Sequence, residues 1–171
     1  MARSKPPRMR TAPTSAFIVV DGRRWRTSDP HIPPNLRQEL VNELMAARRA
    51  VRDATSPAEL RTSRCRVNDA KVALGERGHP WWLPPEPAAT ARRIEAALKA
   101  LLRSREAGRT ICPSDVARIV GAATWRTLLA LVRERAVAMR TRGELEILRR
   151  GQVVRERPTE GVLRYRLTAP A

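Results

Sequence analysis

The sequence predicts a mainly α protein with small β-hairpins, in which a C-terminal winged helix-turn-helix follows a β-hairpin and an antiparallel helical hairpin. Three observations predict this fold class. Residues 110–167 contain the patterns of a short helix, a tight turn, a long helix and two strands joined by an arginine-rich loop, in the element order of a winged helix-turn-helix. Before them come two helical apolar stripes with a short connection and, earlier still, a strand pair with an Asp-Gly turn.

Composition divides the chain into four predicted parts. Residues 1–16 are basic and proline-containing with little to bury, so we expect a disordered arm that either enters a nucleic-acid groove or makes no specific contact. Residues 17–82 form the predicted N-terminal domain. Residues 83–89, LPPEPAA, are a linker that three prolines stiffen, and residues 90–168 form the predicted winged-helix domain.

The first predicted element is a hairpin over residues 17–26, FIVV-DG-RRWR. The Asp-Gly pair is typical of a two-residue turn between strands. The second strand places Arg23, Arg24 and Arg26 around Trp25. From the sequence, this tryptophan either anchors the hairpin or stacks on a base.

Two helices follow the hairpin and form an antiparallel pair because their connection is short. Ser56, Pro57 and Glu59 mark the start of the second helix, as a capping serine, a proline at the first helical position and a glutamate that bonds back to the cap. The buried faces are predicted from residues three, four or seven apart: Leu36, Leu40, Leu44, Ala47 and Val51 in the first helix, and Leu60, Val67 and Leu74 in the second, with Cys65 beside them.

A third helix is predicted from Thr90 to Gly108, with an apolar stripe that includes Leu98. The next helix starts at Pro113 or Ser114. We expect Gly121 to stop it in the left-handed conformation, and Thr124 to cap the long helix that follows.

The long helix has two predicted faces. Trp125, Val132 and Met139 belong to its apolar stripe, whereas Arg126, Arg133 and Arg140 recur every seven residues on an outward stripe. We predict that this stripe, with Thr127 beside it, faces a major groove. Arginine on the outside of an amphipathic helix is also common without any ligand.

Gly143 ends the long helix, and two strands then enclose a basic loop, the predicted wing. The loop carries Arg149, Arg150, Arg155 and Arg157, which we expect on flanking phosphates, and LRYRL alternates as a half-buried strand should. The alternative is that the wing is a purely structural hairpin, because nearby glutamates partly cancel the charge of the loop. These glutamates are Glu144, Glu146, Glu156 and Glu160.

The charge of the chain favours a polyanionic partner. Thirty-four Lys and Arg residues face seventeen Asp and Glu, which gives a formal net charge of +17 over 171 residues. The excess is present in both halves, so the N-terminal domain offers a second basic surface, predicted at Arg23, Arg24, Arg26, Arg48, Arg49 and Arg52.

Catalytic, metal and cofactor sites are not expected. Cys65 and Cys112 lack metal-ligand spacing and are predicted as two buried free thiols. His31 and His79 lie in proline-flanked loops without interpretable partners, and no glycine-rich phosphate loop is present. No run approaches the length of a membrane span, so we expect no membrane contact and a cytoplasmic, nucleoid- or ribosome-associated protein.

Parts of the chain also resemble a known family. RTICPSDVARIVG, WRTLLALVRERAVAMRTRGELEILRRGQVV and LRYRL resemble a bacterial domain family of unknown function with a predicted winged-helix fold, over roughly residues 92–168. The basic runs in residues 22–52 and 73–82 resemble an uncharacterised helical segment seen fused to that domain. The resemblance implies the fold and brings no catalytic residues.

Three functions remain open from the sequence, none of them enzymatic. DNA binding through the winged helix-turn-helix is favoured. RNA or ribosome association is the near alternative, because both halves are basic. A protein-interaction module with a protein partner or a second copy is the third, since the fold alone does not determine function.

Overall fold

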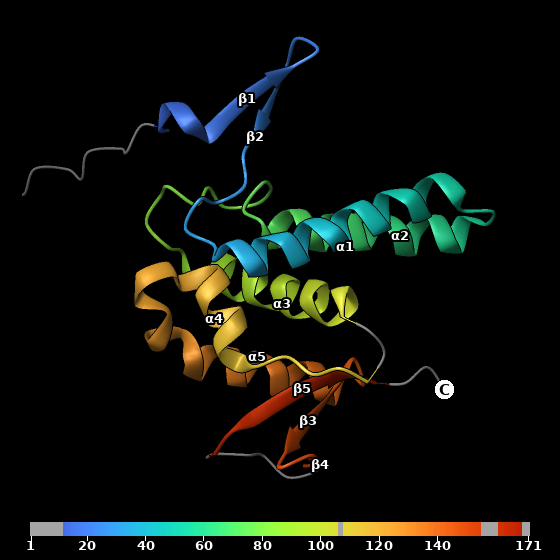
Figure 1. Ribbon diagram of the computed structural model, residues 1–171, viewed down its shortest axis with the longest axis vertical. Helices are drawn as coiled ribbons and strands as arrows, with labels where there is room; N and C mark the ends of the chain where they lie inside the picture. Colours follow the sequence, from blue (N-terminus) through green and yellow to red (C-terminus); the bar gives the residue numbers. More distant parts are fainter. Residues whose placement is uncertain (1–11, 106–107, 155–160, 169–171) are drawn as a thin grey trace, which may run out of the picture.

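The computed structural model describes residues 12–105, 108–154 and 161–168 (Figure 1). The protein is mainly helical with small antiparallel hairpins, as predicted, and its helices in the C-terminal half lead into a small sheet. The elements are η1 (Thr14–Ala16), β1 (Phe17–Val20), β2 (Arg23–Arg26), α1 (Pro34–Asp53), α2 (Pro57–Ala73), α3 (Pro87–Ser104), α4 (Pro113–Gly121), η2 (Ala122–Leu128), α5 (Leu129–Thr141), β3 (Leu145–Arg149), β4 (Gln152–Val153) and β5 (Leu163–Leu167).

The β1–β2 hairpin projects from the helical body (Figure 1). Its turn has positive φ at both Asp21 and Gly22, 49° and 72°, which is the backbone that an Asp-Gly pair tolerates. Phe17 at its base meets the edge of Trp82 with ring centroids 5.5 Å apart. The predicted hairpin is therefore confirmed.

Helices α1 and α2 form the predicted antiparallel pair. Ser56 Oγ accepts the Glu59 backbone N–H at 3.2 Å, and the Glu59 carboxylate accepts the Thr55 N–H at 2.8 Å, so the predicted boundary is confirmed. The hydrogen bonds from Thr55 lower the pKa of Glu59. Between the helices, Arg66 makes two 2.9 Å hydrogen bonds to Glu43, whose side chain is buried.

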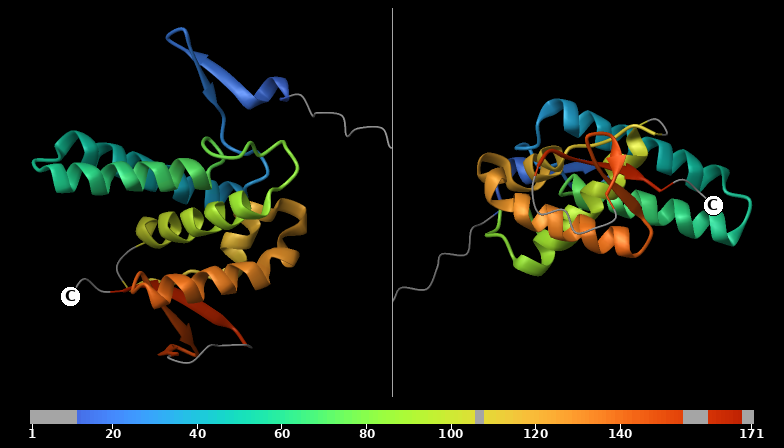
Figure 2. Two further views of the ribbon diagram at one scale, coloured as in Figure 1. Left: turned by 180° about the vertical axis from the view of Figure 1, so that it is seen from behind. Right: turned by 90° about the horizontal axis from the view of Figure 1, so that it is seen from below.

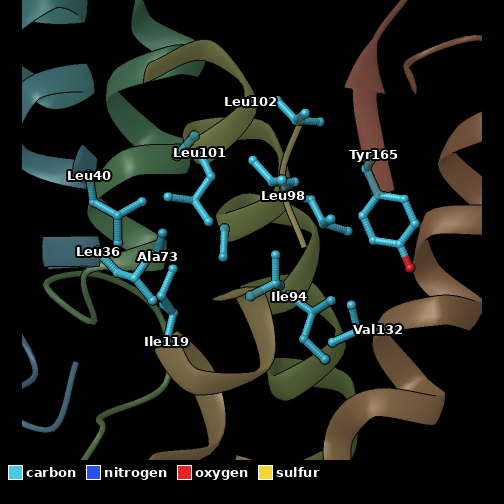
Figure 3. Packing of buried hydrophobic residues seen from close by; sticks show 14 of the residues in the cluster. Leu36, Leu40, Ala73, Ile94, Leu98, Leu101, Leu102, Ile119, Val132 and Tyr165 are labelled. Carbon is cyan, nitrogen blue, oxygen red and sulfur yellow. The ribbon is translucent and has the colours of Figure 1, made fainter. Parts of the chain in front are cut away.

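Helix α3 is the centre of the molecule and separates α1 and α2 from α5 and the sheet (Figures 1 and 2). It begins at Pro87, inside the predicted linker, because proline is well suited to the first helical turn. One buried cluster extends from Leu36 on α1 through Leu98 and Leu101 on α3 to Tyr165 on β5 (Figure 3). The two predicted domains thus share a hydrophobic core.

The C-terminal sheet has the order β4-β3-β5, and both pairs are antiparallel. Ile111, between α3 and α4, adds a bridge to Tyr165 through two backbone hydrogen bonds of 2.9 and 3.0 Å. Strand β4 was not predicted from the sequence. This two-residue strand returns on β3 through a tight turn at Arg150 and Gly151, which have φ of 53° and 81°.

The turn after α4 differs from the prediction. Gly121 has φ −104°, so it is not left-handed; Ala122 instead has φ 44° and ψ −122°. Glycine is favoured at position 121 because there is no room for a side chain: a Cβ there would lie 2.9 Å from Leu128 Cδ1. Thr124 does not cap α5 either, since its hydroxyl donates to the Gly121 carbonyl within the 3₁₀ segment η2.

Candidate nucleic-acid interface

The predicted arginine stripe is spread over different environments. Arg126 is exposed on η2, whereas Arg133 is half-buried and its Nε has no hydrogen-bond partner in the described part of the chain. Arg140 is half-buried as well, and its Nη1 donates to the Val154 carbonyl beside β4 at 3.0 Å. The prediction of one shared outward stripe is therefore wrong in its geometry.

The reason lies in the helix type. The stripe assumes 3.6 residues per turn from position 126 onward, but η2 is a 3₁₀ segment with about three residues per turn, and the α-helix begins only at Leu129. The phase of α5 is therefore displaced relative to Arg126. The exposed side of α5 instead carries Ala130, Glu134 and Thr141.

An aromatic ring and two arginines form a cluster at the α4–η2 turn. The Arg118 guanidinium lies 4.9 Å from the Trp125 ring centroid, and that of Arg126 lies 4.5 Å from it. Both arginines are exposed, while Trp125 is half-buried and packs against the core. We call Arg118, Trp125 and Arg126 the Trp125 cluster. Thr127 beside it is exposed, and its hydroxyl donates to the Thr124 carbonyl at 2.8 Å.

The second group of exposed arginines lies at the tip of the wing. Arg149 and Arg150 at the end of β3 and Arg164 on β5 line a shallow depression that also includes Gly151 and Gln152. We call these three arginines the wing-tip group. The predicted contacts Arg155 and Arg157 lie outside the described residues.

The acidic residues near the wing neutralise other arginines. Glu146 binds Arg166 at 2.7 Å, and Glu144 binds both Arg142 and Lys99. Among the described residues, no acidic partner forms an ion pair with any member of the Trp125 cluster or the wing-tip group. Glu144 and Glu146 therefore pair with residues outside the wing-tip group, whereas Glu156 and Glu160, predicted to act with them, lie outside the described residues.

The predicted second surface is divided between two places. Arg23 and Arg24 are exposed on the hairpin, but Arg26 turns inward, donates to the Gly78 carbonyl at 2.9 Å and has its pKa lowered by burial. The other three arginines, Arg48, Arg49 and Arg52, lie in the last turns of α1, roughly 20 Å along that helix from its start. Arg48 and Arg49 are exposed, and Arg52 binds its neighbour Asp53 at 2.8 Å.

Two exposed arginines of the Trp125 cluster and the wing-tip group, Arg118 and Arg164, were not predicted from the sequence as contact residues. Arg118 could have been found, because α4 must bury Val116 and Ile119, which leaves position 118 on its outer side. Arg164 is the outward residue of a strictly alternating strand, so the pattern gave its direction but not its proximity to Arg149.

The part of the chain that the structure describes contains no group of three His, Cys, Asp or Glu residues that could hold a metal ion. Cys65 is exposed, so the prediction of two buried thiols is wrong there, because it lies beside rather than on the apolar stripe of α2. Cys112 is half-buried at the N-cap of α4, where its N–H donates to the Asp115 carboxylate at 3.3 Å.

Comparison with known proteins finds a matching family model over the C-terminal part of the chain. Within the described ranges, no helix combines the length and the apolar character that crossing a membrane requires. No curated protein shows significant similarity to the chain. Residues 91–168, from α3 to the end of β5 and including the Trp125 cluster and the wing tip, match the family model described as Protein of unknown function (DUF3253).

Proposed function

We propose that residues 90–168 form a winged helix-turn-helix that binds duplex DNA. The order of elements supports this proposal: α3, the Ile111 bridge, α4, the η2–α5 segment, and the β3–β5 pair with its loop. In such a domain the second helix of the turn approaches the major groove, and the strand loop reaches the flanking backbone. Here η2 takes the place of the first turn of that helix.

The observation that carries the proposal is the pairing state of the arginines. Much of the acidic charge in the described part is bound to arginines of the body, as in the pairs Arg103–Asp69, Arg105–Glu39 and Arg166–Glu146. Among the residues that the structure describes, the arginines of the Trp125 cluster and the wing-tip group have no such acidic partner and keep their side chains exposed. Arginines of this kind suit phosphates and guanine edges, because the guanidinium fork donates two hydrogen bonds to one acceptor group.

The two groups have different proposed roles. Stacking on Trp125 restricts the rotamers of Arg118 and Arg126, so less side-chain entropy is lost when they bind at a groove. Arg149, Arg150 and Arg164 are proposed phosphate contacts. Arg155 and Arg157, which lie outside the described residues, stay proposed contacts from the sequence. Thr127 stays a proposed contact beside Arg126, whereas Arg133 and Arg140 are left with a positioning role toward the sheet.

A matched pair of triple variants tests this function. We expect Arg126→Ala/Arg149→Ala/Arg150→Ala to weaken binding to a labelled duplex by at least about tenfold in fluorescence anisotropy, and to lower the salt slope by roughly 2 to 3. The control Arg37→Ala/Arg61→Ala/Arg64→Ala removes the same charge from exposed positions of α1 and α2 and should retain most of the affinity. Equal losses in both variants, or no binding at about 0.15 M salt, would contradict the proposal.

The main alternative is RNA or ribosome association, favoured by the exposed arginines on the hairpin and on α1 as well as on the C-terminal domain. Competition between duplex DNA and structured RNA at one salt concentration separates the two. Preferential displacement by RNA would replace DNA as the proposed ligand. A co-purifying protein in place of any nucleic acid would instead favour an interaction module.

A further inference from the structure

A cleft of about 540 Å³ lies between the two halves of the chain. Its floor is the first half of α3, and its two walls are the loop from α2 to α3 and the α4–η2 turn. Both of these segments lie near the N-terminal end of α3 in Figures 1 and 2. This volume is within the range of roughly 300 to 1,000 Å³ that small-molecule sites occupy. The cleft is therefore large enough for an organic ligand with a ring.

Apolar side chains from both halves line much of this cleft. Val72 and Trp81 come from α2 and the loop after it, and Val120 and Leu128 come from α4 and η2. Trp81 is held in place by its indole N–H, which donates to the Thr27 carbonyl at 3.4 Å. These side chains give a ligand apolar contacts that a bare phosphate group would not use.

The acidic residues of the lining are already neutralised. Asp29 is buried and binds Arg93 at 2.9 Å, Asp69 binds Arg103 at 2.7 Å, and Glu95 binds Arg142 at 3.1 Å. The lining cation Lys99 is also paired, with Glu144 at 2.9 Å. These groups therefore leave little net charge in the cleft.

Two lining arginines remain without an acidic partner among the described residues. Arg77 and Arg92 are both exposed, and the Arg77 guanidinium donates to the Asn68 side-chain carbonyl at 2.8 Å. Their position in the lining makes the uncompensated charge of the cleft positive. A cationic rim and an apolar interior together select an anion that also has a hydrophobic body.

We propose that this cleft binds a small organic anion, with its carboxylate, sulfonate or phosphate group at Arg77 and Arg92 and its apolar or aromatic part against Trp81 and Leu128. Binding here needs no nucleic acid and does not depend on the DNA-binding proposal. Ligand in the cleft also contacts the wall formed by η2, the segment that carries Trp125 and Arg126. The bound ligand would therefore also influence the proposed DNA interface, and this consequence rests on the proposed function.

The probe for the test is 1-anilinonaphthalene-8-sulfonate, an aromatic sulfonate whose fluorescence rises in apolar surroundings. We expect saturable binding of one molecule per full-length chain. Arg77→Ala/Arg92→Ala should weaken this binding by at least about tenfold, because two charge-assisted contacts are lost. The control Arg61→Ala/Arg64→Ala removes the same charge from α2 outside the cleft and should bind the probe as the natural chain does.

A second variant and a second measurement locate the probe. Thr127→Trp places bulk on the cleft wall at an exposed position and should reduce binding without lowering the melting temperature. Saturating probe should slow amide hydrogen exchange in residues 121–128. Binding that is unsaturable, or equally strong in Arg77→Ala/Arg92→Ala, would overturn the cleft proposal. Probe binding that follows these expectations in a chain that binds no DNA would overturn only the proposed function.

Discussion

Tyr165 is the residue whose surroundings are least usual for its type. It is completely buried, and its hydroxyl has no hydrogen-bond partner among the described residues. Burial raises the pKa of the hydroxyl well above its ordinary value, while the charge of Arg133 opposes that shift. A buried hydroxyl without a partner costs free energy, so the ring rather than the oxygen accounts for the stabilising effect of this residue.

We therefore expect Tyr165→Phe to leave the free energy of unfolding unchanged or to raise it by up to about 1 kcal/mol, measured by urea denaturation. Because its pKa is raised, the Tyr165 hydroxyl stays neutral in the folded state at a pH where it ionises in the unfolded chain. Its contribution to the free energy of unfolding is therefore fully present below about pH 10 and is lost as the pH rises above that value. Tyr165→Phe should lack this loss. Tyr165 is the one tyrosine of the chain, so tyrosinate absorbance reports on it alone. If Tyr165→Phe instead lowered the free energy of unfolding by more than about 2 kcal/mol, the hydroxyl would have a hydrogen-bond partner in the folded protein.

Ala122 has a backbone conformation that residues with a Cβ rarely adopt, φ 44° and ψ −122°. Such strain costs about 1 to 3 kcal/mol, whereas the extra unfolded-state freedom of glycine costs about 0.5 to 1 kcal/mol. We expect Ala122→Gly to raise the melting temperature in differential scanning calorimetry. Ala123→Gly, at an exposed neighbour without positive φ, is the control and should lower it.

Among the elements, α2 has the cap that the sequence indicates best. Ser56→Ala removes the acceptor of the Glu59 N–H, and we expect a loss of about 1 kcal/mol in urea denaturation. Ser56→Asp keeps an acceptor at the cap and should restore most of the stability. If Ser56→Asp lost as much stability as Ser56→Ala, the cap hydrogen bond would not be what stabilises this helix start.

Elements whose ends depend on local chemistry could be predicted. The Asp21–Gly22 turn, the Ser56 cap and the helix end at Gly143, with φ 74°, each need only a few neighbouring residues. The α4–η2 turn was not predicted, because the glycine at 121 is favoured by its closeness to Leu128 rather than by a left-handed backbone, and the positive φ falls on Ala122. The orientation of Arg133 and Arg140 depends on that turn, so the predicted interface was wrong on α5 while the exposure of Arg126 and Arg149 could be anticipated.

At the scale of the whole molecule, the separation into two domains is where sequence patterns are least informative. The prolines of residues 83–89 indicate a linker, but Ala97 and Ala100 on α3 are fully buried. Leu101 lies on the side of α3 toward Leu40 of α1, while Leu98 and Leu102 lie on the side toward Tyr165 of the sheet (Figure 3). Alanine is only weakly hydrophobic and adds little to an apolar pattern. The second buried side of α3 is therefore not apparent from the periodicity of its hydrophobic residues.

A shared core predicts one cooperative unfolding transition, because neither half can expose α3 without losing buried area in the other. Leu101→Ala should then cost about 2 to 5 kcal/mol and shift far-UV circular dichroism and tryptophan fluorescence together. Val153→Ala, at an exposed position, should shift neither by much. Two separated transitions, with Leu101→Ala moving only one, would mean that α1 and α2 fold apart from the domain of residues 91–168. The cleft at Arg77 and Arg92 would then lie between two independently moving parts.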